Sequence, residues 1–290
     1  MRGDSGVQAD TKCRHPLSKN PSLFGARRTG FSKGFGHSIP VCPKTLVFSH
    51  GATPAKRPGW YRFRSGTGLP YAVRHVAGFE PTIVVAMDSH SHWETVYATK
   101  SPKEVSWYAP HLEASLTLIK RVAPDPVTRI LDVGSGASTL PDDLLANGYA
   151  DICVLDISER ALETTKARLG PRARDVHWIF ADVTTAQLPD KSFDLWHDRA
   201  VFHFLTDAED RRRYVDQVAR CIRPGGHVII GTFGPEGPSQ CSGLGVVRYD
   251  EHSLHGEFGA QFRLLDSLLE VHQTPFGTTQ QFQYCLCSLR

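Results

Sequence analysis

The chain has 290 residues, of which 40% are hydrophobic and 10% aromatic, with 19 Pro, 25 Gly and 7 Cys. This composition excludes a purely disordered, collagenous or disulfide-scaffold protein, and without a run of 18 apolar residues we expect no membrane-spanning helix. The formal net charge of +3 is unevenly divided: residues 1–86 carry 13 Lys/Arg and 3 Asp/Glu, whereas residues 87–290 carry 20 and 27. The two parts, at +10 and −7, are different kinds of sequence.

Residues 1–86 form a basic leader that we expect to be largely unstructured, because they hold 8 Pro, 11 Gly and only four Leu. Three explanations remain for it. An Arg-rich, acid-poor composition is typical of an organelle transit segment. Alternatively, translation starts at Met87, the only Met besides Met1, and the leader is a gene-model extension. A basic tail that binds nucleic acid or a membrane surface is the third.

Seven cysteines, an odd number without CxxC spacing, favour reduced thiols in a cytosol-like compartment. We therefore expect a cytoplasmic location, or a mitochondrial one if the leader is a real transit segment.

Residues 87–290 are long enough for one α/β domain with a proper core. In chain order, helices are expected near 93–97 and over 113–122, 140–147, 159–169 and 207–221. The expected strands are 129–133, 151–156, 176–181, 193–198, 227–233, 262–271 and 280–289. Alternating strands and helices predict a parallel, doubly wound sheet, and the last two strands predict an antiparallel hairpin that closes it.

A glycine turn follows the first of these strands, in the segment RILDVGSGASTL. The strand ends at Asp132, the chain turns through Gly134 and Gly136, and a helix follows. Glycines allow a sharp turn and a close approach of a ligand, and the helix presents free N–H groups. Many strand-to-helix turns also use glycine for geometry alone, so the turn gains its weight from the residues around it.

Carboxylates follow the next strands. Asp156 lies twenty residues after Gly136, where a carboxylate can accept both hydroxyls of a ribose. The alternative is an acid that interacts with the dipole of the following helix. Asp182 ends the third strand and could accept from an adenine amino group, while the Val183 N–H meets a ring nitrogen.

These segments differ from a dinucleotide fingerprint, because Thr139 stands where a third small residue is expected. The runs LDVGSGAS, VLDIS, FADV, FDLWHDRAVFHFL and RPGGHVIIGTF resemble the successive motifs of the class I S-adenosylmethionine-dependent methyltransferases, over about residues 90–290. The resemblance implies a Rossmann-like, seven-stranded sheet with its last strand antiparallel and helices on both faces. It also implies S-adenosylmethionine as the cofactor.

The resemblance places the methionine part beside Asp132, Gly134 and Gly136, the ribose at Asp156, and the adenine at Asp182 and Val183. The cofactor-binding residues that it implies are Asp132, Gly134, Ser135, Gly136, Asp156, Ile157, Asp182, Val183 and His197. His197 would lie near the methionine amino group or the transferring methyl.

Four residues are candidates for catalysis: His197, Asp198, Arg199 and Tyr249. The first three follow the fourth strand, and Tyr249 ends a Gly/Pro-rich loop over 234–249. Structural alternatives remain, since Asp198 and Arg199 could simply pair with each other. His203, a further candidate that stands between two Phe, could be a packed core residue. No NPPY-like run follows the fourth strand, which weakens the case for a flipped base or a planar amide nitrogen as acceptor.

Aromatic residues are frequent in the segment 92–110, just ahead of the glycine turn. Trp93, Tyr97, Trp107 and Tyr108 could cover a sulfonium by cation–π attraction and exclude water, although packing of a helix explains them equally. This segment also resembles the HW/YW region of methyltransferases that include protein-lysine methylating enzymes acting on citrate synthase or elongation factor 1A.

Three cysteines carry a further hypothesis, since some methyltransferases of this class act on thiophilic elements. Cys285 and Cys287 alternate on a predicted strand and so share a face, where they are also explained as small core residues, and Cys241 lies in the inserted loop. We expect no structural metal site, because no four ligands share a recognisable spacing.

We interpret the chain as an S-adenosylmethionine-dependent methyltransferase that acts on a small-molecule or protein-lysine nucleophile. The alternatives are a catalytically silent binding module of the same fold, or a thiol or metalloid methyltransferase. We expect a methyl-acceptor substrate as partner, neither membrane nor nucleic acid, and a monomer or weak dimer.

Overall fold

The computed structural model describes residues 60–64, 70–74, 82–84 and 88–290. The first three ranges are the strands β1 (Trp60–Arg64), β2 (Pro70–Arg74) and β3 (Thr82–Val84), which form an antiparallel sheet in that order. Regular structure therefore occurs inside the leader, where we expected little. The runs WYRFR and PYAVR are only five residues long, too short for the periodicity test applied to the leader, and two Gly stand between them in the sequence, which is a hairpin signal. The remaining leader residues lie outside the described ranges.

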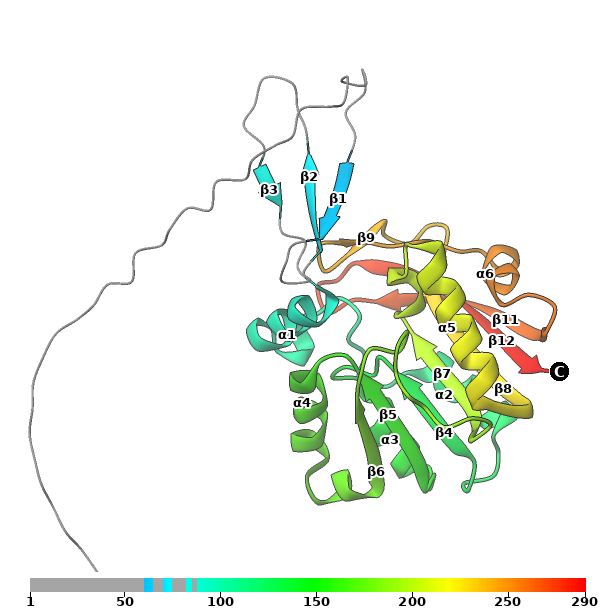
Figure 1. Ribbon diagram of the computed structural model, residues 1–290. Coiled ribbons are helices and arrows are strands. Elements are labelled where there is room, and N and C mark those ends of the chain that lie inside the picture. Colours follow the sequence, from blue (N-terminus) through cyan, green and yellow to red (C-terminus); the bar gives the residue numbers. More distant parts are fainter. Residues whose placement is uncertain (1–59, 65–69, 75–81, 85–87) are drawn as a thin grey trace, which may run out of the picture. The chain divides into compact units, whose positions relative to one another are not determined.

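A seven-stranded mixed sheet forms the centre of the domain, with the strand order β11-β12-β8-β7-β4-β5-β6 (Figure 1). Its strands are β4 (Arg129–Val133), β5 (Asp151–Asp156), β6 (Val176–Phe180), β7 (Phe193–Arg199), β8 (Ile222–Phe233), β11 (Phe262–Gln273) and β12 (Thr279–Leu289). Strands β4 to β8 pair in parallel, and β12 is antiparallel to both β8 and β11. The predicted fold, including the closing hairpin, is confirmed.

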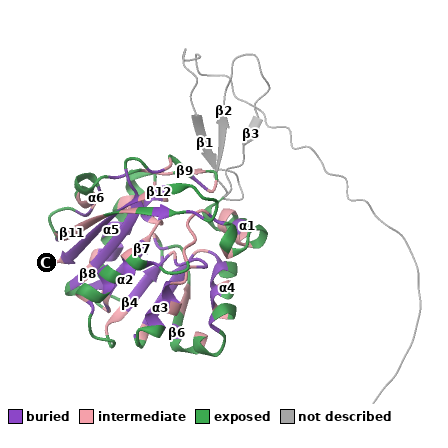
Figure 2. Cartoon of the chain, turned by 180° about the vertical axis from the view of Figure 1, so that it is seen from behind, coloured by how far each residue is buried: buried purple, intermediate pink, exposed green. Residues whose placement is uncertain are grey.

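Helices cover both faces of this sheet. They are α1 (Ser89–Thr99), α2 (Glu113–Val122), α3 (Leu140–Ala146), α4 (Glu159–Leu169), α5 (Ala208–Cys221) and α6 (Glu251–Phe258), with the short 3-10 helices η1 (Pro102–Glu104), η2 (Gly170–Asp175) and η3 (Phe202–Phe204). One buried cluster joins α5 and α6 to the sheet, and a second joins α2, α3 and α4 to its other face. Figure 2 shows the buried strands between exposed outer helix surfaces.

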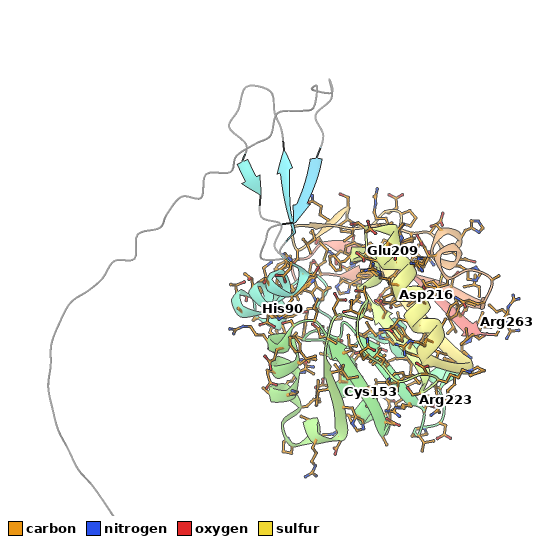
Figure 3. The ribbon with its side chains drawn as sticks, in the orientation of Figure 1. His90, Cys153, Glu209, Asp216, Arg223 and Arg263 are labelled. Carbon is orange, nitrogen blue, oxygen red and sulfur yellow. The ribbon has the colours of Figure 1, made fainter. Side chains whose placement is uncertain are left out.

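Local sequence explains why the elements begin and end where they do. Ser158 is the predicted N-cap of α4, and its Oγ accepts the Ala161 N–H at 3.2 Å. The outer face of α5 is charged, with Arg212 paired to Glu209 at 2.6 Å and to Asp216 at 3.2 Å, so this helix packs on one side only (Figure 3).

The segment between β8 and β11 contains elements that we did not predict. The hairpin strands β9 (Gln240–Cys241) and β10 (Leu244–Gly245) lie within the loop 234–249, and α6 follows at Glu251. Two-residue strands leave no periodicity to detect. Helix α6 buries only Leu254 and Phe258 and contains Gly256, which lowers helix propensity, so its signal in the sequence is weak.

Within the described ranges, every helix is too short or too polar to cross a lipid bilayer.

Candidate functional site

A cavity of about 210 Å³ lies at the carboxyl ends of β4, β5 and β7 and along the segment that follows β6, which is the edge where open α/β sheets bind ligands. Residues of α1 and of the segment 102–112, which precede β4 in the chain, also form part of the cavity wall. The cavity therefore combines the glycine turn, the carboxylates after the strands and the aromatic segment that the sequence singled out.

The glycine turn forms the floor of the cavity. Gly134 and Gly136 have φ values of +60° and +56°, in the left-handed region that favours glycine. A Cβ on Gly134 would fall 1.8 Å from Val201 Cγ2, and one on Gly136 would fall 2.2 Å from Tyr97 Oη. Both positions therefore require glycine for conformation and for space.

Asp156 is fixed by two backbone amides. Its carboxylate accepts the Gly136 N–H at 2.7 Å and the Ser158 N–H at 2.8 Å. The residue lines the cavity yet is only 5% exposed, and this burial raises its pKa to about 6, although the two amide hydrogen bonds act in the opposite direction. The carboxylate consequently joins the glycine turn to the start of α4.

Three side chains form a buried chain under the cavity. His197 Nδ1 lies 2.7 Å from Asp132 Oδ1, and its Nε2 lies 2.9 Å from Ser115 Oγ. Within the described part of the chain, Asp132 Oδ2 and Ser135 Oγ are buried without a hydrogen-bond partner, and both residues line the cavity. Buried polar atoms are normally partnered, so these two suit a polar ligand group such as an ammonium at this place.

Asp182 and its neighbours form the far end of the cavity. Asp182 is exposed, and its Oδ1 accepts both the N–H and the hydroxyl of Thr184 at 2.8 Å. Val183 is buried and Ile157 partly buried, and both line the cavity. The nine residues for which the resemblance implies cofactor contact thus surround the same hollow, except that Gly136 contributes its backbone beneath it.

Asp198 and Tyr249 lie away from the cavity. The fully buried Asp198 carboxylate accepts the N–H groups of Val201 and Phe202 and the Tyr214 hydroxyl, at 2.9, 3.1 and 2.5 Å. Tyr249 is buried against Phe202. The structure thus places both residues outside the cavity wall, where Asp198 shapes the loop after β7 and Tyr249 packs in the core.

Arg199 does not pair with Asp198. Its guanidinium donates to Tyr284 Oη at 3.0 Å and to the Trp107 carbonyl at 3.1 Å, and its nearest carboxylate is Glu270, at 4.0 Å. This side chain lines the cavity and, through the Trp107 carbonyl, also holds the segment 102–112 to the sheet. His203 is a packed core residue, as the structural alternative has it. Burial lowers its pKa to about 3, and its Nδ1 accepts the Phe233 N–H at 3.1 Å.

Aromatic residues of α1, of the segment 102–112 and of η3 form a cluster over the cavity. The Trp93 ring lies 6.3 Å from Tyr97, 6.0 Å from Trp107 and 5.1 Å from Phe204, between ring centroids. All four residues line the cavity, so they form its wall as well as packing against one another. Helix α1 is held by Glu94, which accepts the Ser158 hydroxyl at 2.8 Å and the Arg160 N–H at 3.1 Å.

Sequence reasoning missed Ser115 and Glu94. Ser115 is a polar residue within the buried stripe of α2, beside Leu116 and Ile119, and that exception to the apolar pattern was a usable signal. Glu94 had no comparable signal, because it acts on a helix that begins 65 residues later. Cys285 and Cys287 are both buried in the core cluster, whereas Cys241 lines the cavity.

Comparisons with known proteins agree with this geometry. Residues 131–230 match the family described as methyltransferase domain. The chain is 31% identical over 168 residues to the eEF1A lysine and N-terminal methyltransferase of Bos taurus, which covers 51% of this chain and 24% of that protein. It is 33% identical over 114 residues to the demethylmenaquinone methyltransferase of Clavibacter sepedonicus, covering 39% and 44%.

Among solved structures, a SAM-dependent methyltransferase from Anabaena variabilis superposes with a TM-score of 0.56 at 17% identity, over 74% of this chain and 99% of that one. The fold is therefore the Rossmann-like fold of S-adenosylmethionine-dependent methyltransferases, and residues 131–230 match a methyltransferase domain. The matched residues, 131–230, run from within β4, just ahead of the glycine turn, to within β8. The chain spans less than half the length of the two curated relatives named above.

Proposed function

We propose that the protein transfers a methyl group from S-adenosylmethionine to a small-molecule or protein-lysine nucleophile. One observation carries the proposal: a single cavity brings together the glycine turn with its positive φ angles, the Asp156 carboxylate held by backbone amides, and the unpartnered oxygen of Asp132. A catalytically silent module has no physical need for all three.

The residues fit the cofactor from end to end. Asp182 and the Val183 N–H would hold the adenine, Asp156 the ribose hydroxyls, and Asp132 Oδ2 the methionine amino group. His197 acts on Asp132 as a positioning residue, because it holds Oδ1 and leaves Oδ2 directed to the ligand.

S-adenosylmethionine, when bound, supplies a methyl group on a positively charged sulfur. The protein's task is then to align the acceptor and exclude water, which is worth about 7–11 kcal/mol of the barrier when well done. Trp93, Tyr97 and Trp107 supply apolar, electron-rich surfaces for both purposes.

The relatives support both acceptor classes, since one is named for lysine and N-terminal methylation of eEF1A and another for demethylmenaquinone. The methyl acceptor is the expected partner, and we propose a monomer or weak dimer. The five cysteines of residues 88–290 are free thiols, which supports our proposal of a cytoplasmic location.

Two measurements test the function. Calorimetry should detect binding of S-adenosylmethionine to the full chain, and Asp156→Ala should weaken it about tenfold or more through loss of charge-assisted hydrogen bonds. Asp190→Ala, in an exposed loop, is the matched control. A tritiated-methyl screen of lysate fractions should then label a protein or a small-molecule acceptor. An unmodified chain that binds no S-adenosylmethionine would contradict the proposal.

A further inference from the structure

Helix α4 holds the glycine turn from the side away from the cavity. Its Thr165 hydroxyl donates to the Gly136 carbonyl at 3.0 Å. Its Arg168 guanidinium donates to the Ala137 carbonyl at 2.9 Å and to the Ser138 carbonyl. Three successive carbonyls of the turn are therefore bound by one helix. Ala137 and Ser138 line the cavity, and neither of the two α4 side chains does.

Both α4 side chains are fixed in place. Thr165 is fully buried, so the Gly136 carbonyl would lose its partner away from water if the hydroxyl were removed. Arg168 is anchored by Asp142 in the first turn of α3, whose carboxylate accepts from Nε at 3.1 Å and from Nη2 at 2.8 Å. The planar guanidinium thus uses several donors at once, which the single ammonium of a lysine cannot match.

The carbonyl contacts decide where the amides of the turn point. In a trans peptide group the C=O and the N–H of the next residue point in opposite directions. Because α4 binds the carbonyls of Gly136 and Ser138, the N–H groups of Ala137 and Thr139 point away from that helix. Both of these residues line the cavity, and so does Tyr97, whose hydroxyl lies beside the Ala137 amide. This side of the turn therefore presents hydrogen-bond donors, which suit a carboxylate.

The rest of the cavity is held by other contacts. The segment 102–112 is fastened at Ser106, where His272 Nε2 and Gln280 Nε2 donate to the carbonyl and the hydroxyl, each at 3.0 Å. Asp156, at the expected ribose position, accepts the amide at the N-cap of α4 besides that of the turn. Loss of the α4 side-chain contacts should therefore disturb the turn and leave the adenosine end largely in place.

We propose that Thr165 and Arg168 are positioning residues for the amino acid part of the cofactor. By binding the three carbonyls, they turn the amides of Ala137 and Thr139 toward the carboxylate of the methionine part. The inference rests on the proposed binding of S-adenosylmethionine and deepens it, because it adds two residues outside the cavity wall that determine how the amino acid part is held.

Two ligands separate this role from a general loosening of the fold. S-adenosylhomocysteine carries the amino acid part, whereas methylthioadenosine keeps the adenosine and the sulfur but lacks it. Calorimetry with the full chain should show that Arg168→Ala weakens S-adenosylhomocysteine about tenfold or more and methylthioadenosine by less than about twofold. Arg174→Ala, whose exposed side chain pairs with Asp175 in η2, is the matched control and should leave both affinities within about twofold.

Thr165 allows a second test that keeps the shape of the side chain. Thr165→Val removes the hydroxyl and should weaken S-adenosylhomocysteine about three- to tenfold, with methylthioadenosine changed by less than about twofold. Thr165→Ser retains the hydroxyl and should bring the S-adenosylhomocysteine affinity back to within about twofold of the natural chain. If Arg168→Ala does not fold, Arg168→Lys replaces it. We expect a selective loss of at least about threefold, because one ammonium cannot span both carbonyls and Asp142.

Equal weakening of the two ligands by Arg168→Ala and Thr165→Val would overturn the inference, since it would show a general role in stability. Unchanged affinity for S-adenosylhomocysteine in these variants, full affinity in Arg168→Lys, or a Thr165→Ser variant as weak as Thr165→Val would overturn it as well and leave the cofactor site standing. A natural chain that binds neither S-adenosylmethionine nor S-adenosylhomocysteine would defeat the proposed function itself.

Discussion

Asp156 joins three parts of the site through one carboxylate: the glycine turn, the start of α4 and the expected ribose position. Both of its oxygens already accept backbone amides, and each carboxylate oxygen has a second lone pair available for a ligand hydroxyl. The backbone therefore positions this carboxylate before any ligand arrives.

The affinity for S-adenosylmethionine should depend on pH through this residue. Burial raises the pKa of Asp156 to about 6, and ribose hydroxyls bind the charged form better. Binding therefore lowers that pKa, so affinity is constant above about pH 7 and falls toward about tenfold per pH unit below 6. Calorimetry between pH 5 and 8 should show this for the natural chain and weaker, flatter binding for Asp156→Asn. Identical pH profiles would assign the dependence elsewhere; Asp198, with a pKa also near 6, is unchanged in the variant.

Gly136 should tolerate alanine less well than another left-handed glycine. Alanine in this conformation costs about 1–2 kcal/mol of unfolding free energy at either position. At Gly136 the new Cβ also meets the Tyr97 hydroxyl, whereas at Gly148, with φ +87°, it meets nothing within 4 Å. Urea unfolding should show the greater loss for Gly136→Ala, and calorimetry should show weakened cofactor binding for that variant only. Equal losses would mean that the contact with Tyr97 is unimportant.

The positions of residues at the cavity were predictable where the backbone decides them and not where side-chain direction does. Asp156 and the glycines follow from strand ends and spacing. His197 and Asp198 are adjacent, and alternation on β7 sends them to opposite faces, toward Ser115 on α2 and Tyr214 on α5. The sequence alone does not say which of two such neighbours faces the cavity.

Helix α1 depends on a contact with the N-terminus of α4. Glu94 accepts the Ser158 hydroxyl and the Arg160 amide, and its carboxylate lies 3.1 Å from Arg160 Nε. An acid at a helix N-terminus is favourable, so one carboxylate both completes the cap of α4 and fixes α1.

Glu94→Ala should loosen α1 without unfolding the sheet. We expect faster amide hydrogen exchange over residues 89–99 and weaker cofactor binding, while exchange in β4 and β5 stays unchanged. Glu163→Ala, which removes only an exposed pair with Lys166 on α4, is the control. Unchanged exchange in α1 would show that its aromatic packing suffices to hold it.

Elements with strong periodicity were predicted nearly to their bounds, as for α2 at 113–122 and β5 at 151–156. Elements held by tertiary contacts were not. Helix α6 has two buried anchors. Strand β8 begins at Ile222 rather than 227 because Ile222 pairs with Phe193, beyond an irregularity in the register that precedes the Leu195–His227 pair.

Across the whole domain, the two buried clusters meet the cavity from opposite faces of the sheet, so cofactor binding and global stability should be coupled. S-adenosylmethionine at a hundred times its Kd should add about 2.7 kcal/mol to the unfolding free energy. For a domain of this size the Tm should rise by about 5–10 °C. Thermal unfolding with and without the cofactor measures this, and Asp156→Ala at the same concentration should show a smaller rise. A Tm unmoved by a bound cofactor would mean that the site opens independently of the core.

The contacts at Ser106 have a consequence for the order of synthesis. Its two partners, His272 and Gln280, lie 166 and 174 residues later in the chain, on either side of the turn between β11 and β12. The ribosome therefore releases the glycine turn and the carboxylates of Asp132, Asp156 and Asp182 long before the strands that hold the segment 102–112 over the cavity. A nascent chain should acquire its cofactor cradle early, and a closed reaction chamber only with its last strands.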